Sequence, residues 1–200
     1  MPRTPEENNR IRQASKEKIR AAAMELFMKQ GYYATSISDI AKQGGISKGL
    51  LYNYYKGKEE LLAEMVETRI REVVEVMEEA TTLETASEQL EYIVNGAIDN
   101  IYQNPKVHRF YLHLQTQPEA DEELIKYSYL IIEENARQFE FQCEIFERMG
   151  INEPRKRSLY FSSVLQGSML MISTYPQKFP IEEIKAQIIH EFCRSSNVFR

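Results

Sequence analysis

The sequence predicts an all-α fold, and three observations support this class. Apolar residues recur three and four positions apart along most of the 200-residue chain, which is the spacing of one buried helix face. No segment shows the strict apolar/polar alternation of a strand or the Asn-Gly signal of a β-hairpin. Eight glycines and seven prolines are few enough to leave long uninterrupted stretches between turns.

Three short helices are expected near the N-terminus. Residues 1–14 are polar and aperiodic, so we predict that they form a flexible arm. The first helix is expected from Ser15, and the next two follow Ser36 and Ser47, whose hydroxyls suit the N-cap position. Asp39 lies three residues after Ser36, in a variant of the capping box. The glycines expected to end these helices are Gly31, Gly44 with Gly45, and Gly57.

A longer helical region follows. From Lys58 an apolar stripe continues for about five helical turns, to a fraying end at Thr81. Further helices are expected at residues 86–102, 106–116, 121–149, 155–174 and 181–194. The sequence therefore predicts about nine helices, divided between a helix-turn-helix domain at residues 15–60 and a larger helical-bundle domain at residues 61–200.

Charge is distributed unevenly along the chain. Residues 1–58 contain eleven Lys or Arg and five Asp or Glu, whereas the remainder contains fourteen and twenty-five, for a formal net charge of -5. A basic first part followed by an acidic remainder indicates that only the first part meets a polyanion. Taken alone this signal is modest, because such imbalances also occur on ordinary solvated surfaces.

The N-terminus and the cysteines indicate the compartment. Residues 1–7 contain no apolar stretch that could act as a secretion signal, and no run approaches the roughly 18 apolar residues of a membrane span. Cys143 and Cys193 are too few for a disulfide framework, and neither has a Cys or His at ligand spacing beside it. We expect a cytoplasmic protein without membrane contact, in which both thiols are reduced.

The second and third short helices have the features of a DNA-reading helix-turn-helix. In that motif one helix braces against the DNA backbone, while the next enters the major groove with its N-terminal residues toward the base edges. Gly45 suits the turn, and Leu51 and Tyr55 are spaced to face inward. A short helix after a glycine turn is also compatible with plain scaffold, but the basic charge favours DNA binding. The residues expected to face outward are Lys48, Gly49, Leu50, Tyr52 and Asn53.

The same region carries a specific motif. Its segments are Gly31–Ala41, Gly45–Gly49, Leu51–Tyr55 and Lys58–Leu62. Together they resemble the signature of the TetR family of transcription regulators, over about residues 15–64. Two mild departures are Tyr55, where Phe is usual, and Gly57, where Ser, Asn or Asp is commoner.

The resemblance implies roles for individual positions. Lys48, Gly49 and Tyr52 would approach the bases, and Leu50 would touch a thymine methyl. The residues implied in phosphate contacts are Thr35, Ser36, Ser47, Tyr54 and Lys58.

The resemblance also implies a ligand cavity between the middle helices. Candidate lining residues are Tyr102, His108, Phe110, Tyr111, Leu114, Gln117, Tyr127, Phe139, Cys143, Gln166 and Met169. Most aromatic residues at helical spacing are simple core residues, and that alternative stays open for each. His108 and His113 are five positions apart and do not share a helix face, so no metal site is expected. A cationic aromatic ligand and a fatty or steroidal one are equally compatible with this acidic, tyrosine-rich domain.

The last two helices would form the dimer contact in family members. Their apolar stripes consist of Phe161, Val164, Leu165, Ser168 and Ile172, and of Ile184, Ile188, Ile189 and Phe192. Two such stripes could close a four-helix bundle around a two-fold axis. Ordinary packing within one chain is the alternative.

The sequence therefore predicts a homodimeric, sequence-specific DNA-binding regulator with no cofactor. The predicted mode is repression, with release from a palindromic double-stranded operator by an unknown small-molecule effector. An enzyme is not expected, because the chain lacks a phosphate-cradling glycine loop, a G-x-S-x-G elbow, an H-E-x-x-H pair and a paired-cysteine metal site. A TetR-like activator and a helical protein-interaction adaptor without DNA binding are the alternatives.

Overall fold

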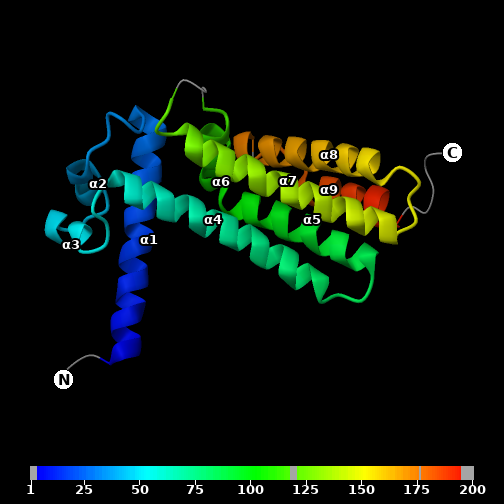
Figure 1. The fold of residues 1–200 in the computed structure, drawn as a ribbon, viewed down its shortest axis with the longest axis horizontal. Helices are drawn as coiled ribbons and strands as arrows, with labels where there is room; N and C mark the ends of the chain where they lie inside the picture. Colours follow the sequence, from blue (N-terminus) through cyan, green and yellow to red (C-terminus); the bar gives the residue numbers. More distant parts are fainter. Residues whose placement is uncertain (1–3, 118–120, 176, 195–200) are drawn as a thin grey trace. The chain divides into compact units, whose positions relative to one another are not determined.

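The structure is a computed structural model that describes residues 4–117, 121–175 and 177–194. Within these ranges every regular element is a helix, which confirms the predicted all-α class (Figure 1). The helices are α1 (Pro5–Gln30), α2 (Ile37–Gln43), α3 (Lys48–Tyr52), α4 (Lys58–Thr81), α5 (Ala86–Gln103), α6 (Pro105–Gln115), α7 (Ile125–Arg148), α8 (Pro154–Thr174), α9 (Ile181–Ile189) and a π-helix at His190–Arg194. None of these described helices is long and apolar enough to cross a membrane. The chain divides into two compact units, unit 1 at residues 1–68 and unit 2 at residues 69–200.

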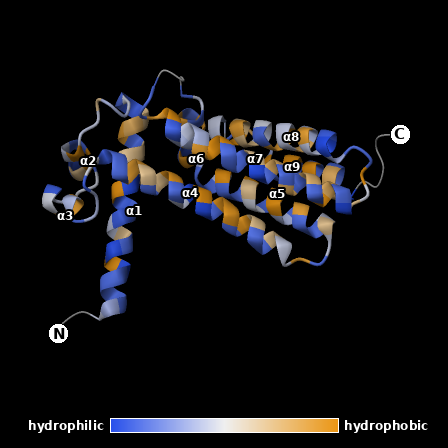
Figure 2. Ribbon diagram, in the orientation of Figure 1, coloured by the Kyte–Doolittle hydropathy of each residue, from blue (hydrophilic) through white to orange (hydrophobic). Residues whose placement is uncertain are grey.

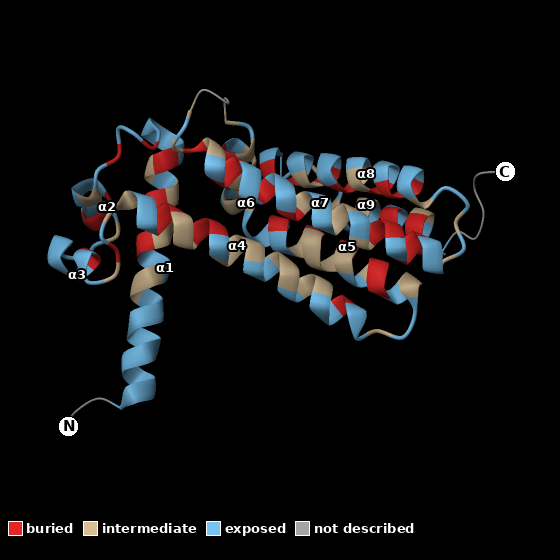
Figure 3. Cartoon of the chain, in the orientation of Figure 1, coloured by how far each residue is buried: buried red, intermediate tan, exposed pale blue. Residues whose placement is uncertain are grey.

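Helix α1 begins earlier than its apolar pattern predicts. The predicted flexible arm at residues 1–14 is wrong for residues 5–14, which are helical, while residues 1–3 lie outside the described residues. The Thr4 hydroxyl accepts the N–H of Glu7, and Pro5 occupies the first helical position. Residues 4–14 are all exposed, as the pale N-terminal half of α1 shows in Figure 3. This part of the helix has no buried face, so apolar periodicity could not reveal it.

Unit 1 has its own small core. Its buried apolar members are Ile19, Ala22, Ala23, Phe27, Tyr32, Ile40, Ala41, Leu51, Tyr55, Leu61, Leu62, Met65 and Val66. Gly45 connects α2 to α3 with a φ of 63°, a left-handed conformation that glycine adopts without strain. Because Leu51 is fully buried, it anchors α3 and leaves the opposite face of this short helix toward solvent.

The start of α4 belongs to unit 1. The sequence divided the chain between residues 60 and 61, whereas the first compact unit extends to Thr68. Met65 and Val66 are fully buried, whereas Val73 and Val76, further along the same apolar stripe, are only half-buried. The first turns of α4 therefore complete the core of unit 1, and the stripe that looks continuous in sequence serves two environments.

Unit 2 is a helical bundle built from the later part of α4 and the helices that follow it. Figure 2 shows apolar segments recurring along α4 and α5, as the helical spacing predicts. The buried core consists of Leu90, Val94, Ile98, Ile101, Ile145, Phe146, Phe161, Leu165, Ile172, Ile188, Ile189, Phe192 and Cys193. Burial raises the pKa of the Cys193 thiol to about 12, so this side chain is a neutral packing group rather than a reactive thiolate.

The apolar stripes of α8 and α9 face into this core. Five of the predicted dimer-contact residues, Phe161, Leu165, Ile172, Ile188 and Phe192, are buried core residues. Ser168 is also buried, and Val164 and Ile184 pack against the core while half-buried. The structure therefore corrects the predicted interface at the six buried positions, because those side chains pack within one chain, whereas the contact at Val164 and Ile184 stays a prediction. Periodicity reveals that a face is apolar but not which chain covers it.

Candidate nucleic-acid interface and ligand cavity

The outward face of α3 presents most of the residues expected to read bases. Lys48, Gly49, Leu50, Tyr52 and Asn53 are all exposed, and Tyr52 retains 49% of its surface. The Lys48 ammonium lies 5.9 Å from the centroid of the Tyr52 ring, so a cation and an aromatic hydroxyl stand side by side. Hydrogen-bond donors and an apolar contact on one helix face suit the edges of bases in a major groove.

The two predicted N-cap residues, Ser36 and Ser47, cap helices α2 and α3. The Ser36 hydroxyl accepts the N–H of Asp39 and donates to the carboxylate of Asp39, so the capping box is present. The hydrogen bonds that the hydroxyl and the backbone N–H of Ser36 donate to this carboxylate lower the pKa of Asp39. The Ser47 hydroxyl accepts the N–H of Leu50 at 3.1 Å. Both serines are exposed, so each can still meet a phosphate at the surface.

Two predicted phosphate contacts have internal roles. Thr35 is only 2% exposed, and its hydroxyl donates to the carbonyl of Gly31 at 2.8 Å. The structure therefore removes Thr35 from the surface set, because its side chain stabilises the loop after α1. The half-buried Lys58 donates to the carbonyls of Tyr32 and Tyr33, at 2.9 and 3.2 Å, and lies 4.4 Å from the Tyr32 ring centroid. Its ammonium holds that same loop.

Arg12 is a further candidate contact at this surface; from the sequence it could enter a minor groove, although a non-specific tail was the favoured interpretation of its segment. Its guanidinium carbon lies 5.8 Å from the centroid of the Tyr54 ring, and Tyr54 is one of the predicted phosphate contacts. Arg12 is exposed and reaches this position because residues 5–14 are helical. The Thr4-Pro5-Glu6-Glu7 run, an N-cap followed by proline and first-turn acids, is the signal that could have revealed it.

Glu64 on α4 is the polar centre of unit 1. It accepts from the Lys16 ammonium at 2.7 Å, from Arg20 at 3.4 Å and from the Tyr55 hydroxyl at 2.9 Å. Burial opposes ionisation of Glu64, but the hydrogen bonds from Lys16 and Tyr55, together with nearby positive charge, outweigh burial and lower its pKa. Burial and the bond to Glu64 together raise the pKa of Tyr55. The cluster fixes α1 and the residues just after α3 against the start of α4.

Replacing Glu64 with Gln is expected to destabilise unit 1 by about 1–3 kcal/mol at neutral pH, because a charged acceptor for three donors is lost. The pKa of Glu64 is lower in the folded chain than its ordinary value of 4.5, so its stabilisation is complete above that value and disappears as the pH falls through the folded pKa. Urea denaturation at about pH 7 and pH 3.5 measures the difference. Glu67→Gln, at an exposed position of α4, is the control. A loss that is equal at both pH values would contradict the role of the carboxylate.

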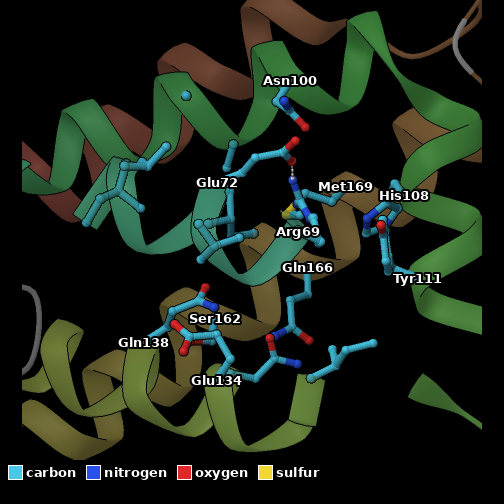
Figure 4. Close-up of a pocket in the computed structure, with 18 of the residues that line it drawn as sticks. Arg69, Glu72, Asn100, His108, Tyr111, Glu134, Gln138, Ser162, Gln166 and Met169 are labelled. Atoms are coloured by element: carbon cyan, nitrogen blue, oxygen red, sulfur yellow. Dashed lines mark hydrogen bonds and ion pairs between the residues drawn. The ribbon is translucent and has the colours of Figure 1, made fainter. Parts of the chain in front are cut away.

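Unit 2 contains a cavity of about 710 Å³, a size that accepts a drug-sized molecule. Helices α4 to α8 all contribute lining residues, as the close-up in Figure 4 shows. The apolar lining residues include Ile70, Val73, Val76, Met77, Ile93, Leu112, Ile131, Leu165 and Met169. Val73 and Val76 of α4 are thus half-buried because they face this cavity.

The side of the cavity formed by α7 and α8 is polar. Glu134 and Gln138 project into it from α7, next to Ser162 from α8 (Figure 4). The Ser162 hydroxyl donates to the amide oxygen of Gln142 at 2.7 Å. Burial raises the pKa of Glu134, although Arg137 and Gln138 partly offset this effect. These polar residues occupy helix positions spaced like core residues, which is the sequence signal that could have identified them.

Arg69 and His108 complete the polar lining. The Arg69 guanidinium lies 3.4 Å from the Glu72 carboxylate, an ion pair visible in Figure 4. Burial, with the Arg69 charge as a second cause, lowers the pKa of His108 to about 4. His108 is therefore neutral at neutral pH. In the parts of the chain that the structure describes, no group of three or more His, Cys, Asp or Glu side chains could hold a metal ion.

Four of the ligand candidates from the sequence line this cavity: His108, Tyr111, Gln166 and Met169. The others do not. Tyr102 is exposed, and Gln117 and Phe139 are half-buried away from the lining. The buried candidates outside the lining are Phe110, Leu114, Tyr127 and Cys143. Their helical spacing reflects core packing, which was the alternative that the sequence left open.

Comparisons with known proteins agree on the family. Residues 19–65 match the family model described as bacterial regulatory proteins, tetR family. The Fatty acid metabolism regulator protein of Bacillus subtilis is 35% identical over 75 residues, which is 37% of this chain and 39% of that relative. The HTH-type transcriptional regulator LmrA of Bacillus subtilis is 42% identical over 72 residues, 34% of this chain and 38% of the relative. The matched region thus spans about two fifths of the length of these curated relatives.

Solved structures extend the likeness to the whole fold. The MbdR regulator from Azoarcus sp. CIB superposes with a TM-score of 0.71 at 16% sequence identity, covering 92% of this chain and 100% of that one. At this identity the likeness shows the fold alone. The relatives are transcriptional regulators, in agreement with the prediction that the chain is not an enzyme. The predicted resemblance is confirmed over the matched region: residues 19–65 of this chain are similar to the tetR family of bacterial regulatory proteins.

Proposed function

We propose that this protein is a sequence-specific DNA-binding repressor that leaves a palindromic operator when a small molecule occupies the cavity of unit 2. The observation that carries the proposal is the outward face of α3, where Lys48, Leu50, Tyr52 and Asn53 are exposed on a helix anchored by the buried Leu51. A rigid helix that presents base-reading side chains is what entry into a major groove requires. The basic charge of residues 1–58 supplies the attraction to phosphate.

The proposal requires two copies of the chain, because one recognition helix buries too little surface to find a site in a genome. Since the predicted contact residues form the core, the proposed interface is the exposed face of α8. Its apolar and small members are Leu159, Tyr160, Ser163, Gly167, Leu170 and Met171. Of these, Ser163, Gly167 and Leu170 also line the cavity of unit 2, so the proposed interface adjoins that cavity. A face of this kind, left exposed on one chain, is typical of an association surface.

Substitution of Gly167 by Arg is expected to convert the dimer into monomers. A Cβ at Gly167 would meet no atom of its own chain within 4 Å, so the fold of one chain has room for a side chain there. A partner chain packed against this glycine would leave no such room. The charged side chain is expected to weaken dimerisation about hundredfold. Light scattering after size-exclusion chromatography measures the mass. Tyr102→Asp, on an exposed site of α5, should remain dimeric. A dimeric Gly167→Arg protein would place the interface elsewhere.

Helix α4 is the proposed link between ligand and DNA. It is one uninterrupted helix that starts at Lys58 in unit 1 and supplies lining residues from Arg69 to Glu79 in unit 2. A ligand that fills the cavity alters the packing available to the half-buried Val73 and Val76. In a dimer, the two copies of unit 1 must be about one helical turn of DNA apart to bind the operator. If the liganded protein prefers another distance between them, ligand binding shifts the protein population away from the operator.

The proposed function is tested by selecting duplexes from a random-sequence pool with the full chain. We expect the selected sequences to converge on an inverted repeat and their affinity to fall steeply with salt. Fluorescence anisotropy measures both. A pool that does not converge, or binding that is independent of salt, would contradict the proposal and favour a protein-interaction role.

A further inference from the structure

The cavity in unit 2 has an unbalanced set of charges. Carboxylates line it at Glu72, Glu75, Glu79 and Glu134. Among the described lining residues, Arg69 is the single lysine or arginine. Its guanidinium is already paired with Glu72 at 3.4 Å and lies 6.0 Å from the Tyr111 ring centroid. An anionic ligand group entering the cavity therefore meets net negative charge and a cation that is already engaged.

Glu134 is the most buried of these four carboxylates. Its residue is only 4% exposed, whereas its ion-pair partner Arg137 has a side chain that is 65% exposed. The two groups are 3.5 Å apart, at the outer limit of a hydrogen bond. Gln138 also hydrogen-bonds this carboxylate, but a neutral amide does not balance its charge. With so distant a cationic partner the buried carboxylate is incompletely neutralised, and a cation placed within the cavity would stabilise it.

The surroundings of Glu134 supply hydrogen-bond acceptors and a separate apolar wall. Gln138 follows one helical turn later on α7, and Gln166 extends the polar side from α8 (Figure 4). Amide and carboxylate oxygens accept the hydrogen bonds that an ammonium donates. On α4, Val73 and Val76 supply an apolar surface between the charged side chains of that helix. The cavity thus combines an accepting side at α7 and α8 with apolar surface on α4, and its carboxylates outnumber its cations.

We propose that the ligand is a monocationic amphiphile, a protonated amine on an apolar body, and that Glu134 is its counter-charge. The ammonium lies against Glu134 and Gln138, and the apolar body lies against Val73, Val76 and Met169. This assignment rests on the proposed function only in taking the cavity as the effector site. A fatty acid or another anionic amphiphile is excluded from the same position by Glu134.

Three probes with the same ten-carbon chain test the sign of the charge: decylamine, decanol and decanoate. Isothermal titration calorimetry on the full-length protein at neutral pH, below the micellar concentration of each probe, measures their affinities without DNA. We expect decylamine to bind about tenfold more tightly than decanol, and decanoate to bind more weakly than either. Equal or tighter binding of decanoate would overturn the proposal. This comparison uses the wild-type protein and is independent of any variant.

Glu134→Gln keeps the shape of the side chain and removes its charge. We expect this variant to bind decylamine about ten- to hundredfold more weakly and to leave the affinity for decanol within about twofold. The matched control is Glu133→Gln, the neighbouring carboxylate on α7, whose side chain is 65% exposed and which is not among the cavity-lining residues. An equal loss in both variants would show a diffuse charge effect and would overturn the role of Glu134.

The two proposals fail in different ways. If the selected DNA does not converge but decylamine still binds through Glu134, the ligand assignment stands and the regulatory function is wrong. If DNA is bound specifically but decylamine shows no advantage over decanoate, the regulatory function stands and the ligand assignment is wrong. Release of operator DNA by decylamine from wild type, and not from Glu134→Gln, would support both.

Discussion

Replacement of both Lys48 and Tyr52 with alanine is expected to abolish retention of operator DNA in a gel-shift assay while the proposed dimer stays intact. Both side chains are exposed on the outward face of α3, and neither belongs to the core of unit 1. Each specific base contact contributes about 1–3 kcal/mol. The double variant loses two such contacts from each of the two chains, which weakens DNA binding by at least about hundredfold. Size-exclusion chromatography should show an unchanged mass.

The chain offers a matched control for this experiment. Tyr102 and Lys106 are also four positions apart and exposed, but they belong to unit 2. The double variant Tyr102→Ala, Lys106→Ala removes the same side chains and the same charge, and it should retain DNA as the wild type does. Undiminished DNA binding by the α3 variant would remove this helix as the reader.

Phe161→Ala is expected to destabilise unit 2 by about 3–5 kcal/mol, because it empties the space of a large core side chain. Phe161 is 0% exposed, and its ring centroid lies 5.8 Å from that of Phe146 and 5.1 Å from that of Phe192. Removing the ring breaks both edge-to-face contacts at once. Urea denaturation followed by circular dichroism should show a lower midpoint at an unchanged slope.

Leu159→Ala is the control for Phe161→Ala. Leu159 is 61% exposed on the same helix, so a single chain should lose no more than about 0.5 kcal/mol. Comparison at low protein concentration separates folding from association, because only an interface residue loses its effect when the dimer dissociates. If the loss at Phe161 disappeared under those conditions, the sequence interpretation of its stripe as a dimer contact would be right after all.

The sequence predicted the fold class well because local features specify helices. Ser36 and Ser47 cap α2 and α3 where the capping signals placed them, and Gly45 adopts the left-handed turn expected of it. The start of α1 was missed because residues 5–14 bury nothing, although Thr4 and Pro5 carried a start signal. Apolar periodicity reveals only helices that have a buried face. A helix that is exposed on all sides must be predicted from its capping residues.

The sequence predicted the exposed residues of α3 but not the surroundings of Thr35 or the position of Glu134 in the cavity. The outward face of α3 followed from the inward spacing of Leu51, since a short helix with one anchored side has only one other face. Thr35 was misassigned because a hydroxyl that bonds the Gly31 carbonyl looks, in sequence, like one that faces phosphate. Glu134 was missed because aromatic residues were expected to form the cavity, whereas most of them pack in the core.

The sequence by itself determined most of the helices, the turn between α2 and α3, and the resemblance to the tetR family over residues 19–65, because each depends on residues close together along the chain. Only the tertiary structure decided which apolar faces are core, where the cavity lies and which carboxylate it contains. Those properties depend on the neighbours that packing brings to each side chain, and the same apolar stripe can meet its own chain, a second copy or an empty space. Phe161 and Val73 have the same periodicity and opposite surroundings, a filled core and an open cavity.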